Sequence, residues 1–239
     1  MTRTTSWLDR VLYPTYDKNW DDLLFREQIL AHLNHDSIIL DLGAGAGIVA
    51  AMNFRGLAAR VYGVDLDDRV VTNPMLDEGR VSDAGKIPYP DEMFDVVFSD
   101  NVMEHIANPV AVFREVHRVL KPAGVFLFKT PNRNHYMPAI ARFTPHKFHQ
   151  FVNRLRGRAE VDTFPTLYRA NSKGQVQALA EKSGLQIERL SRIEGRPEYL
   201  RFNAVTYVVG TIYERVVNST ELLAPFRILL VAELRKAPS

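Results

Sequence analysis

The chain has 239 residues, 30 Lys and Arg against 28 Asp and Glu, a net charge of +2 and no cysteine. The missing cysteines exclude disulfides, thiolate metal sites and cysteine nucleophiles. The first nine residues are polar and lack the apolar stretch of a signal peptide, so we expect an intracellular, cytoplasmic protein.

The predicted elements alternate between helix and strand. Asp21–Leu33 has apolar residues near helical spacing, and Ser37–Leu42 is a short apolar run typical of a buried strand. Glycines follow, and Ile48–Gly56 is predicted to be a helix. Further strands are predicted at Arg60–Val64, Phe94–Ser99, Val125–Lys129, Leu185–Arg192 and Phe226–Leu234, and further helices at Pro109–Leu120, Ser172–Ser183 and Phe202–Val217.

This alternation predicts an α/β fold with a doubly wound, mostly parallel sheet covered on both faces. Ligands of such sheets bind beyond the carboxyl ends of the strands. The functional residues should therefore follow Leu42, Val64, Ser99 and Lys129.

The first strand ends in L-D-L-G-A-G-A-G at Leu40–Gly47, where glycines permit a sharp turn and a close approach to a ligand. Ile48 stands where the third glycine of a dinucleotide-binding loop would be. Asp65 ends the next strand at the spacing expected for ribose recognition. Ser82-Asp83-Ala84 lies where a third strand would end.

These motifs occur in a fixed order over residues 36–135. They continue with F-D-V-V-F-S-D-N-V-M-E-H-I from Phe94 and V-H-R-V-L-K-P-A-G up to Gly124. Together they resemble the type 11 branch of class I methyltransferases that depend on S-adenosylmethionine (SAM). The resemblance implies a Rossmann-like seven-stranded sheet and SAM as the cofactor. Ala123 departs from the family's frequent second glycine, which is a detail of the turn.

The resemblance also implies roles for individual residues. The methionine part of SAM would contact Asp41 and the glycine loop. The ribose would contact Asp65, and the adenine amino group would contact Asp83. The implied cofactor-binding set is Asp41, Gly43, Ala44, Gly45, Gly47, Asp65, Leu66, Asp83, Ala84, Asn101 and Val102.

Two histidines follow strands at the ligand-facing edge. His105 follows the fourth strand and His135 the fifth, and both are candidate catalytic bases for a hydroxyl acceptor. Each could instead be a packed or surface histidine. The triplet Asn101, Glu104 and His105 is similar to the metal-binding E-x-x-E-H of some related enzymes, but Asn101 replaces the first glutamate, so no metal site is predicted.

We interpret residues 1–239 as a single domain. Residues 1–35 would form an N-terminal lid or helix, 36–131 the SAM-binding core, 132–171 an irregular insertion on the acceptor side, and 172–239 C-terminal helices and strands. Phe202–Tyr213 carries no charge, and is too short to span a bilayer. It would pack on the sheet or the acceptor pocket, line a dimer interface, or touch a membrane surface.

The predicted function is SAM-dependent methyl transfer to an oxygen of a small molecule, a sugar or a lipid-linked intermediate. One alternative is a ribose methyltransferase acting on RNA, because residues 133–239 hold 17 Lys and Arg but only 9 Asp and Glu; nucleic acid is not our expected partner. Another alternative is a non-catalytic partner protein that kept the fold. Peripheral membrane contact and a monomeric or homodimeric state stay open.

Overall fold

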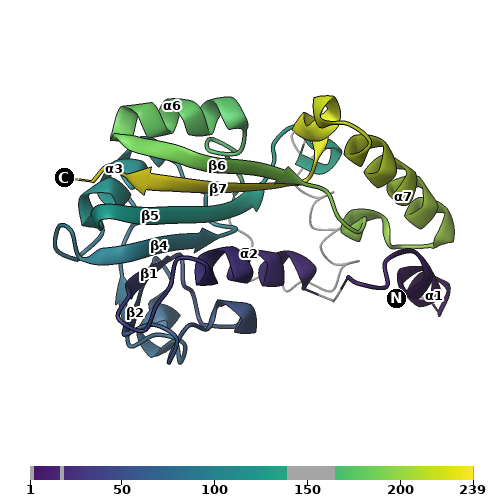
Figure 1. Cartoon of the computed structure of the whole chain (residues 1–239). Coiled ribbons are helices and arrows are strands. Elements are labelled where there is room, and N and C mark those ends of the chain that lie inside the picture. Colours follow the sequence, from purple (N-terminus) through teal and green to yellow (C-terminus); the bar gives the residue numbers. More distant parts are fainter. Residues whose placement is uncertain (1–2, 17–18, 139–164, 239) are drawn as a thin grey trace.

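The computed structural model describes residues 3–16, 19–138 and 165–238. These residues form a seven-stranded sheet in the order β3-β2-β1-β4-β5-β7-β6 (Figure 1). Strand β7 runs antiparallel to both β5 and β6, and the remaining pairs are parallel. The strands are β1 (Ile38–Leu42), β2 (Arg60–Asp65), β3 (Glu78–Val81), β4 (Phe94–Asp100), β5 (Leu120–Pro131), β6 (Leu185–Ile193) and β7 (Leu229–Lys236).

Helices cover both faces of this sheet, as the alternation of elements predicts. α3 (Pro109–Val119) and α6 (Lys173–Ser183) lie on one face, and α2 (Trp20–Leu30) lies on the other (Figure 1). α1 (Arg3–Leu12) and α7 (Ala204–Asn218) lie beyond the carboxyl edge of the parallel strands, on the right of Figure 1. The fold class inferred from the sequence is confirmed.

Local sequence signals fix where several helices begin and end. Asn108 caps α3 through the Ala111 N–H, and Pro109 occupies the first turn, where its missing N–H costs nothing. Ser172 caps α6, which ends at Gly184 in the left-handed conformation. Asn203 begins α7 with a capping box.

Two apolar layers hold the helices on the sheet. On one face, Val112, Phe113 and Val116 of α3 pack against Phe126 and Phe128 of β5. Fully burying such a side chain stabilises the fold by about 1.5–3 kcal/mol. On the other face, Phe25 and Ile29 of α2 pack in a layer with Ile39 of β1 and Phe98 of β4.

Two predicted elements differ from the structure. The segment Ile48–Gly56 is not an α-helix; it contains only the 3₁₀ turn η1 (Ala50–Met52). The backbone is extended at Val49 and Asn53, on either side of η1, so no α-helix continues through the segment, although Met52 and Phe54 are buried. The last strand begins at Leu229, because residues up to Phe226 form the 3₁₀ helix η5 (Glu221–Phe226), with Pro225 inside it.

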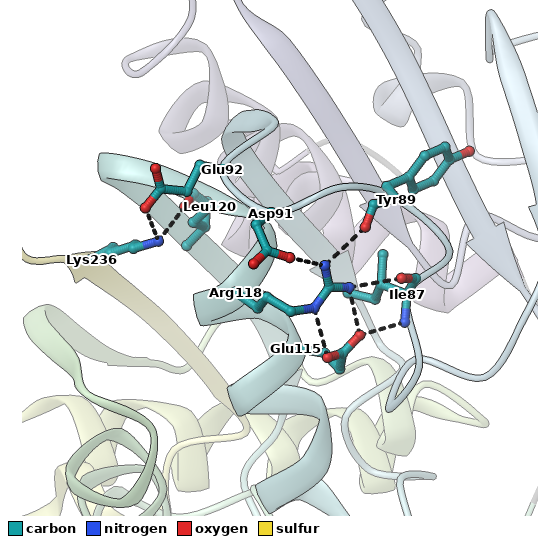
Figure 2. Close-up of polar contacts among 8 residues, drawn as sticks. All are labelled: Ile87, Tyr89, Asp91, Glu92, Glu115, Arg118, Leu120 and Lys236. Atoms are coloured by element: carbon teal, nitrogen blue, oxygen red, sulfur yellow. Dashed lines mark hydrogen bonds and ion pairs between the residues drawn. The ribbon is translucent and has the colours of Figure 1, made fainter.

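The amino edge of the sheet is closed by ion pairs (Figure 2). Arg118 of α3 bonds the Glu115 and Asp91 carboxylates and the carbonyls of Ile87 and Tyr89. Lys236, at the end of β7, donates to Glu92 and to the Leu120 carbonyl. Every charge shown in Figure 2 therefore has a partner inside the protein.

Candidate functional site

The loop after β1 has the conformation that the glycines were expected to permit. Gly43, Gly45 and Gly47 have φ angles of 91°, 49° and 69°, in the region that disfavours other residues. A Cβ atom on Gly43 would lie 2.2 Å from Cγ2 of Val102, which follows β4. The loop thus packs directly against the end of a neighbouring strand.

Asp65 holds this loop from the end of β2. Its Oδ2 accepts the Gly45 N–H at 2.8 Å and its Oδ1 accepts the Asp67 N–H at 2.9 Å. Each carboxylate oxygen keeps a second lone-pair site for a ligand hydroxyl. The structure therefore brings Asp65 and the glycine loop together at one edge.

Asn73 is a loop-binding residue that sequence reasoning missed. Its side-chain amide donates to the Ala44 and Gly45 carbonyls, and a Cβ atom on Gly47 would lie 2.1 Å from its Oδ1. Asn73 is 6% exposed and follows the 3₁₀ helix η2 (Asp68–Thr72). The Asn-Pro pair at 73–74, a turn signal, was the available clue.

Asp41 contributes a buried carboxyl group to the same edge. It is 8% exposed, and its side chain makes no hydrogen bond or ion pair with the described residues. Burial, together with the nearby carboxylates Asp100 and Asp65, raises its pKa well above the usual range. A positive group beside Asp41 would remove this penalty.

Asp100 shares the edge and has a cationic neighbour. Burial raises its pKa to about 6, although Lys129 lies 3.0 Å from its Oδ1 and opposes the rise. Lys129 is fully buried and also pairs with Asp21 and Asp22 of α2. Burial lowers the Lys129 pKa, but the three carboxylates outweigh it and the net shift is upward. Sequence reasoning assigned neither residue a role.

The remaining predicted cofactor residues lie at the ends of other strands. Asp83 follows β3, is exposed, and its Oδ1 accepts the Gly85 N–H at 2.6 Å; Ala84 packs partly against the core beside it. Leu66 is 64% exposed beyond β2. Asn101 has a φ of 54° and its side chain donates to Asp100. All of these lie along the carboxyl edge.

The two histidines differ in burial and in bonding. His105 is partly exposed, with its Nδ1 3.0 Å from the Pro165 carbonyl and its Nε2 4.0 Å from Oε1 of Glu104. His135 is 1% exposed, and its Nδ1 accepts the Met137 N–H at 3.2 Å. Its Nε2 lies 3.5 Å from Oε2 of Glu194.

Burial favours the neutral forms of both members of the His135–Glu194 pair. It lowers the pKa of His135 to about 3 and raises that of Glu194 to about 8. Tyr136 and Tyr213 stack around the imidazole at ring distances of 4.1 and 5.4 Å. The structure thus places His135 in an aromatic core between β5 and α7.

α1 and α7 are bound to each other beyond the carboxyl edge. Tyr207 donates to Asp9, and Tyr13 donates to the buried Glu214. The opposite side of α7 is exposed and apolar, with Val205, Val208, Val209, Ile212 and Val216. Of the expected insertion at 132–171, residues 139–164 lie outside the described part of the chain.

The described residues include neither a membrane-spanning helix nor a cluster of metal ligands. No described helix is long and apolar enough to cross a membrane. Within residues 3–16, 19–138 and 165–238, no three His, Asp or Glu side chains are grouped so that they could hold a metal ion.

Comparisons with known proteins agree with this geometry. Residues 40–128 match the family described as the methyltransferase domain, type 11. A protein of Mycolicibacterium smegmatis named "Probable S-adenosylmethionine-dependent methyltransferase" is 36% identical over 122 residues, which cover 49% of this chain and 46% of that protein. The chain thus spans about half of this relative.

The chain is also similar to a relative over a longer stretch and to a solved structure. A ubiquinone biosynthesis O-methyltransferase of Pseudomonas putida is 28% identical over 193 residues, covering 74% of this chain and 78% of the relative. The crystal structure of an S-adenosylmethionine-dependent methyltransferase from Mesorhizobium loti superposes with a TM-score of 0.57 at 21% identity, over 91% of this chain and 97% of that one. This likeness shows the shared fold.

Proposed function

We propose that the protein is a SAM-dependent methyltransferase of the type 11 branch, whose family model residues 40–128 match, and that it methylates an oxygen atom of a small-molecule acceptor. The observation that carries the proposal is the edge where the glycine loop meets Asp41, Asp65 and Asp100. Three carboxyl groups lie at this edge, and Lys129 is the cation that pairs with one of them, Asp100.

SAM fits the chemistry of this edge. It carries a positive sulfonium and a positive α-amino group, and the unpartnered Asp41 lies where a cation would relieve the charge repulsion. Asp65 keeps lone pairs for ribose hydroxyls, and the left-handed glycines bring backbone close to a ligand. In this proposal Asp83 accepts a hydrogen bond from the adenine amino group. The residues that line the cofactor are Leu66, Ala84, Asn101 and Val102.

SAM supplies a methyl group activated by the sulfonium. The chain has to align the acceptor, exclude water and take the proton that a hydroxyl acceptor loses. The side chains best placed for the last task follow β4 and β5 at the cofactor edge.

His105 is the better oriented base of the two candidates. A carbonyl oxygen only accepts, so the contact with Pro165 places the ring proton on Nδ1 and makes Nε2 the basic nitrogen. In His135 the Met137 N–H occupies Nδ1, so the proton of the neutral ring is on Nε2, facing Glu194. We therefore assign proton removal to His105, and to His135 a role in holding β5 against α7.

The acceptor class is the finer part of the proposal. The name of the Pseudomonas putida relative says that it is an O-methyltransferase of ubiquinone biosynthesis, which supports oxygen as the acceptor atom. The apolar and aromatic surroundings of α1 and α7 suit an apolar or lipid-linked molecule. We further propose that residues 1–239 work as one domain in the cytoplasm, without nucleic acid as substrate.

Labelled methyl transfer tests the proposal. The protein is incubated with SAM labelled in its methyl group and with phenols, catechols, sugars, lipid-linked compounds and RNA, and the products are separated. Label on an oxygen of a small molecule supports the proposal, and His105→Gln should lower its rate by roughly 10²–10⁴-fold. Label on RNA ribose, or none on any acceptor, contradicts it. His135→Gln should retain the rate per folded molecule.

A further inference from the structure

Glu104 is a buried carboxylate beside the proposed base that methyl transfer as described above does not use. It is 5% exposed and immediately precedes His105 in the turn after β4. Burying an acid is costly unless it is paired or hydrogen-bonded, because ionisation in a poorly solvated site is unfavourable. Its contacts therefore call for an explanation.

The Glu104 side chain is held at one oxygen by a directed chain of hydrogen bonds. The Asn171 amide donates to the Thr130 hydroxyl oxygen at 2.6 Å. The single hydroxyl hydrogen of Thr130 then goes to Oε2 of Glu104 at 2.9 Å. Because Asn171 fixes the direction of this chain, Oε2 is an acceptor, as in an ionised carboxylate.

The other oxygen, Oε1, lies on the side of His105, 4.0 Å from Nε2. The main chain of Glu104 is fixed as well, because its carbonyl accepts the Leu167 and Tyr168 N–H groups. The imidazole is thus held at Nδ1 by Pro165 and faces a fixed carboxylate with Nε2. Both restraints come from residues 165–168, near the end of the segment expected to form the acceptor-side insertion.

We propose that Glu104 is a positioning residue for His105, and that its carboxylate stabilises the imidazolium that forms when Nε2 takes the acceptor's proton. Thr130 and Asn171 hold that carboxylate in place. This inference rests on the proposed function, since it assigns Glu104 a part in the same proton transfer.

The charges around the pair agree with this role. Burial raises the pKa of Glu104, and His105 is the strongest influence that lowers it again, followed by bonds within the turn, Thr130 and the more distant Lys129. His105 and Lys129 are therefore the charged neighbours that favour the ionised form of Glu104.

The first arm of the test measures this coupling without any acceptor. The Glu104 carboxyl carbon is followed by ¹³C NMR as the pH is varied, in the wild type and in His105→Gln. We expect the Glu104 pKa to rise in the variant, because the stabilising imidazolium is gone. His117→Gln, a change at the amino edge, should leave it unmoved. An unchanged Glu104 titration in His105→Gln would overturn the inference.

The second arm measures turnover of Glu104→Gln, whose amide oxygen can still accept from Thr130. We expect kcat to fall roughly 10–100-fold, with the acid limb of the pH–rate profile displaced to lower pH and the SAM affinity unchanged. Thr130→Val should show a smaller loss of the same kind.

The two proposals fail differently. Wild-type turnover that survives unchanged in Glu104→Gln overturns the role of Glu104 and leaves the methyltransferase proposal intact. A wild type that transfers no methyl group to any acceptor overturns both.

Discussion

The two edges of the sheet use charge in opposite ways. At the amino edge, Arg118 and Lys236 meet Asp91, Glu92 and Glu115, and each charge has a partner inside the protein (Figure 2). At the carboxyl edge, the Asp41 side chain has no partner among the described residues, and Lys129 is the cation that pairs with Asp100. A buried carboxyl group with a raised pKa and no partner at this edge favours it as a ligand-binding edge.

Loss of Lys129 is expected to lower stability more than any other change at either edge. Lys129→Met leaves Asp21, Asp22 and Asp100 around a buried apolar side chain. Removing one partner of a buried ion pair costs about 3–5 kcal/mol, and we expect a loss of this size in the free energy of unfolding. Denaturant unfolding measures it.

The matched change at the amino edge is Lys236→Met. Its partner Glu92 is largely exposed, so we expect a loss of only about 0–1 kcal/mol. Equal losses for Lys129→Met and Lys236→Met would show that the two edges do not differ as described.

Removal of Asp65 should have the next largest effect, on ligand affinity. Asp65→Ala removes the carboxylate that fixes Gly45 and that we propose holds the ribose. Hydrogen bonds to charged groups contribute about 1.5–3 kcal/mol, so the affinity for S-adenosylhomocysteine (SAH), the demethylated product, should fall roughly 100-fold. Calorimetric titration of folded protein measures this loss, and an unchanged affinity would remove Asp65 from the cofactor site.

Asp41→Asn tests whether charge at the carboxyl edge contributes to ligand affinity, because it replaces the carboxylate by an amide of nearly the same shape. SAM carries the sulfonium and SAH does not, so we expect SAM affinity to fall about tenfold and SAH affinity to fall less. Parallel titrations with the two ligands test this. Equal losses would argue against a charge interaction at Asp41.

Stability should respond to the same substitution with a defined pH dependence. The pKa of Asp41 is raised on folding, so the unfolded chain ionises first and the wild type loses stability as pH rises from about 4 through the raised native pKa. Asp41→Asn should therefore be at least as stable as the wild type near pH 7, with the advantage fading below about pH 4. Thermal unfolding across this range measures it, and a less stable variant at neutral pH is the contrary result.

The smallest effect is expected for Asp91→Ala at the amino edge. Asp91 is largely exposed, and Arg118 keeps its bonds to Glu115 and to two carbonyls. We expect a change of about 0–1 kcal/mol in unfolding free energy and none in SAH affinity. A weakened SAH titration would place ligand binding at both edges.

Several features of the carboxyl edge could be predicted from the sequence, because each is marked by a local pattern of residues. Glycines with left-handed backbone, an acid at the end of β2 and short apolar strands are each recognised within a few residues. The helix predicted at Ile48–Gly56 was wrong, because the backbone is extended on both sides of η1 and buries Met52 and Phe54 without a continuous helix.

Residues that act through distant partners escaped sequence reasoning. Lys129 depends on acids about 108 positions away in the chain, and Glu104 depends on Thr130 and Asn171. Both His105 and His135 follow strands, so the sequence does not distinguish them. In the folded chain they differ in burial and in hydrogen bonding. Only the folded chain shows which atoms meet.

Calorimetric titration of the wild-type protein with SAH, with NAD as the control ligand, tests the central claim most directly. We expect about micromolar binding of SAH and no binding of NAD, since we propose that the carboxyl edge holds the SAM skeleton. No binding of SAH to demonstrably folded protein would contradict it and would favour a fold kept without its cofactor.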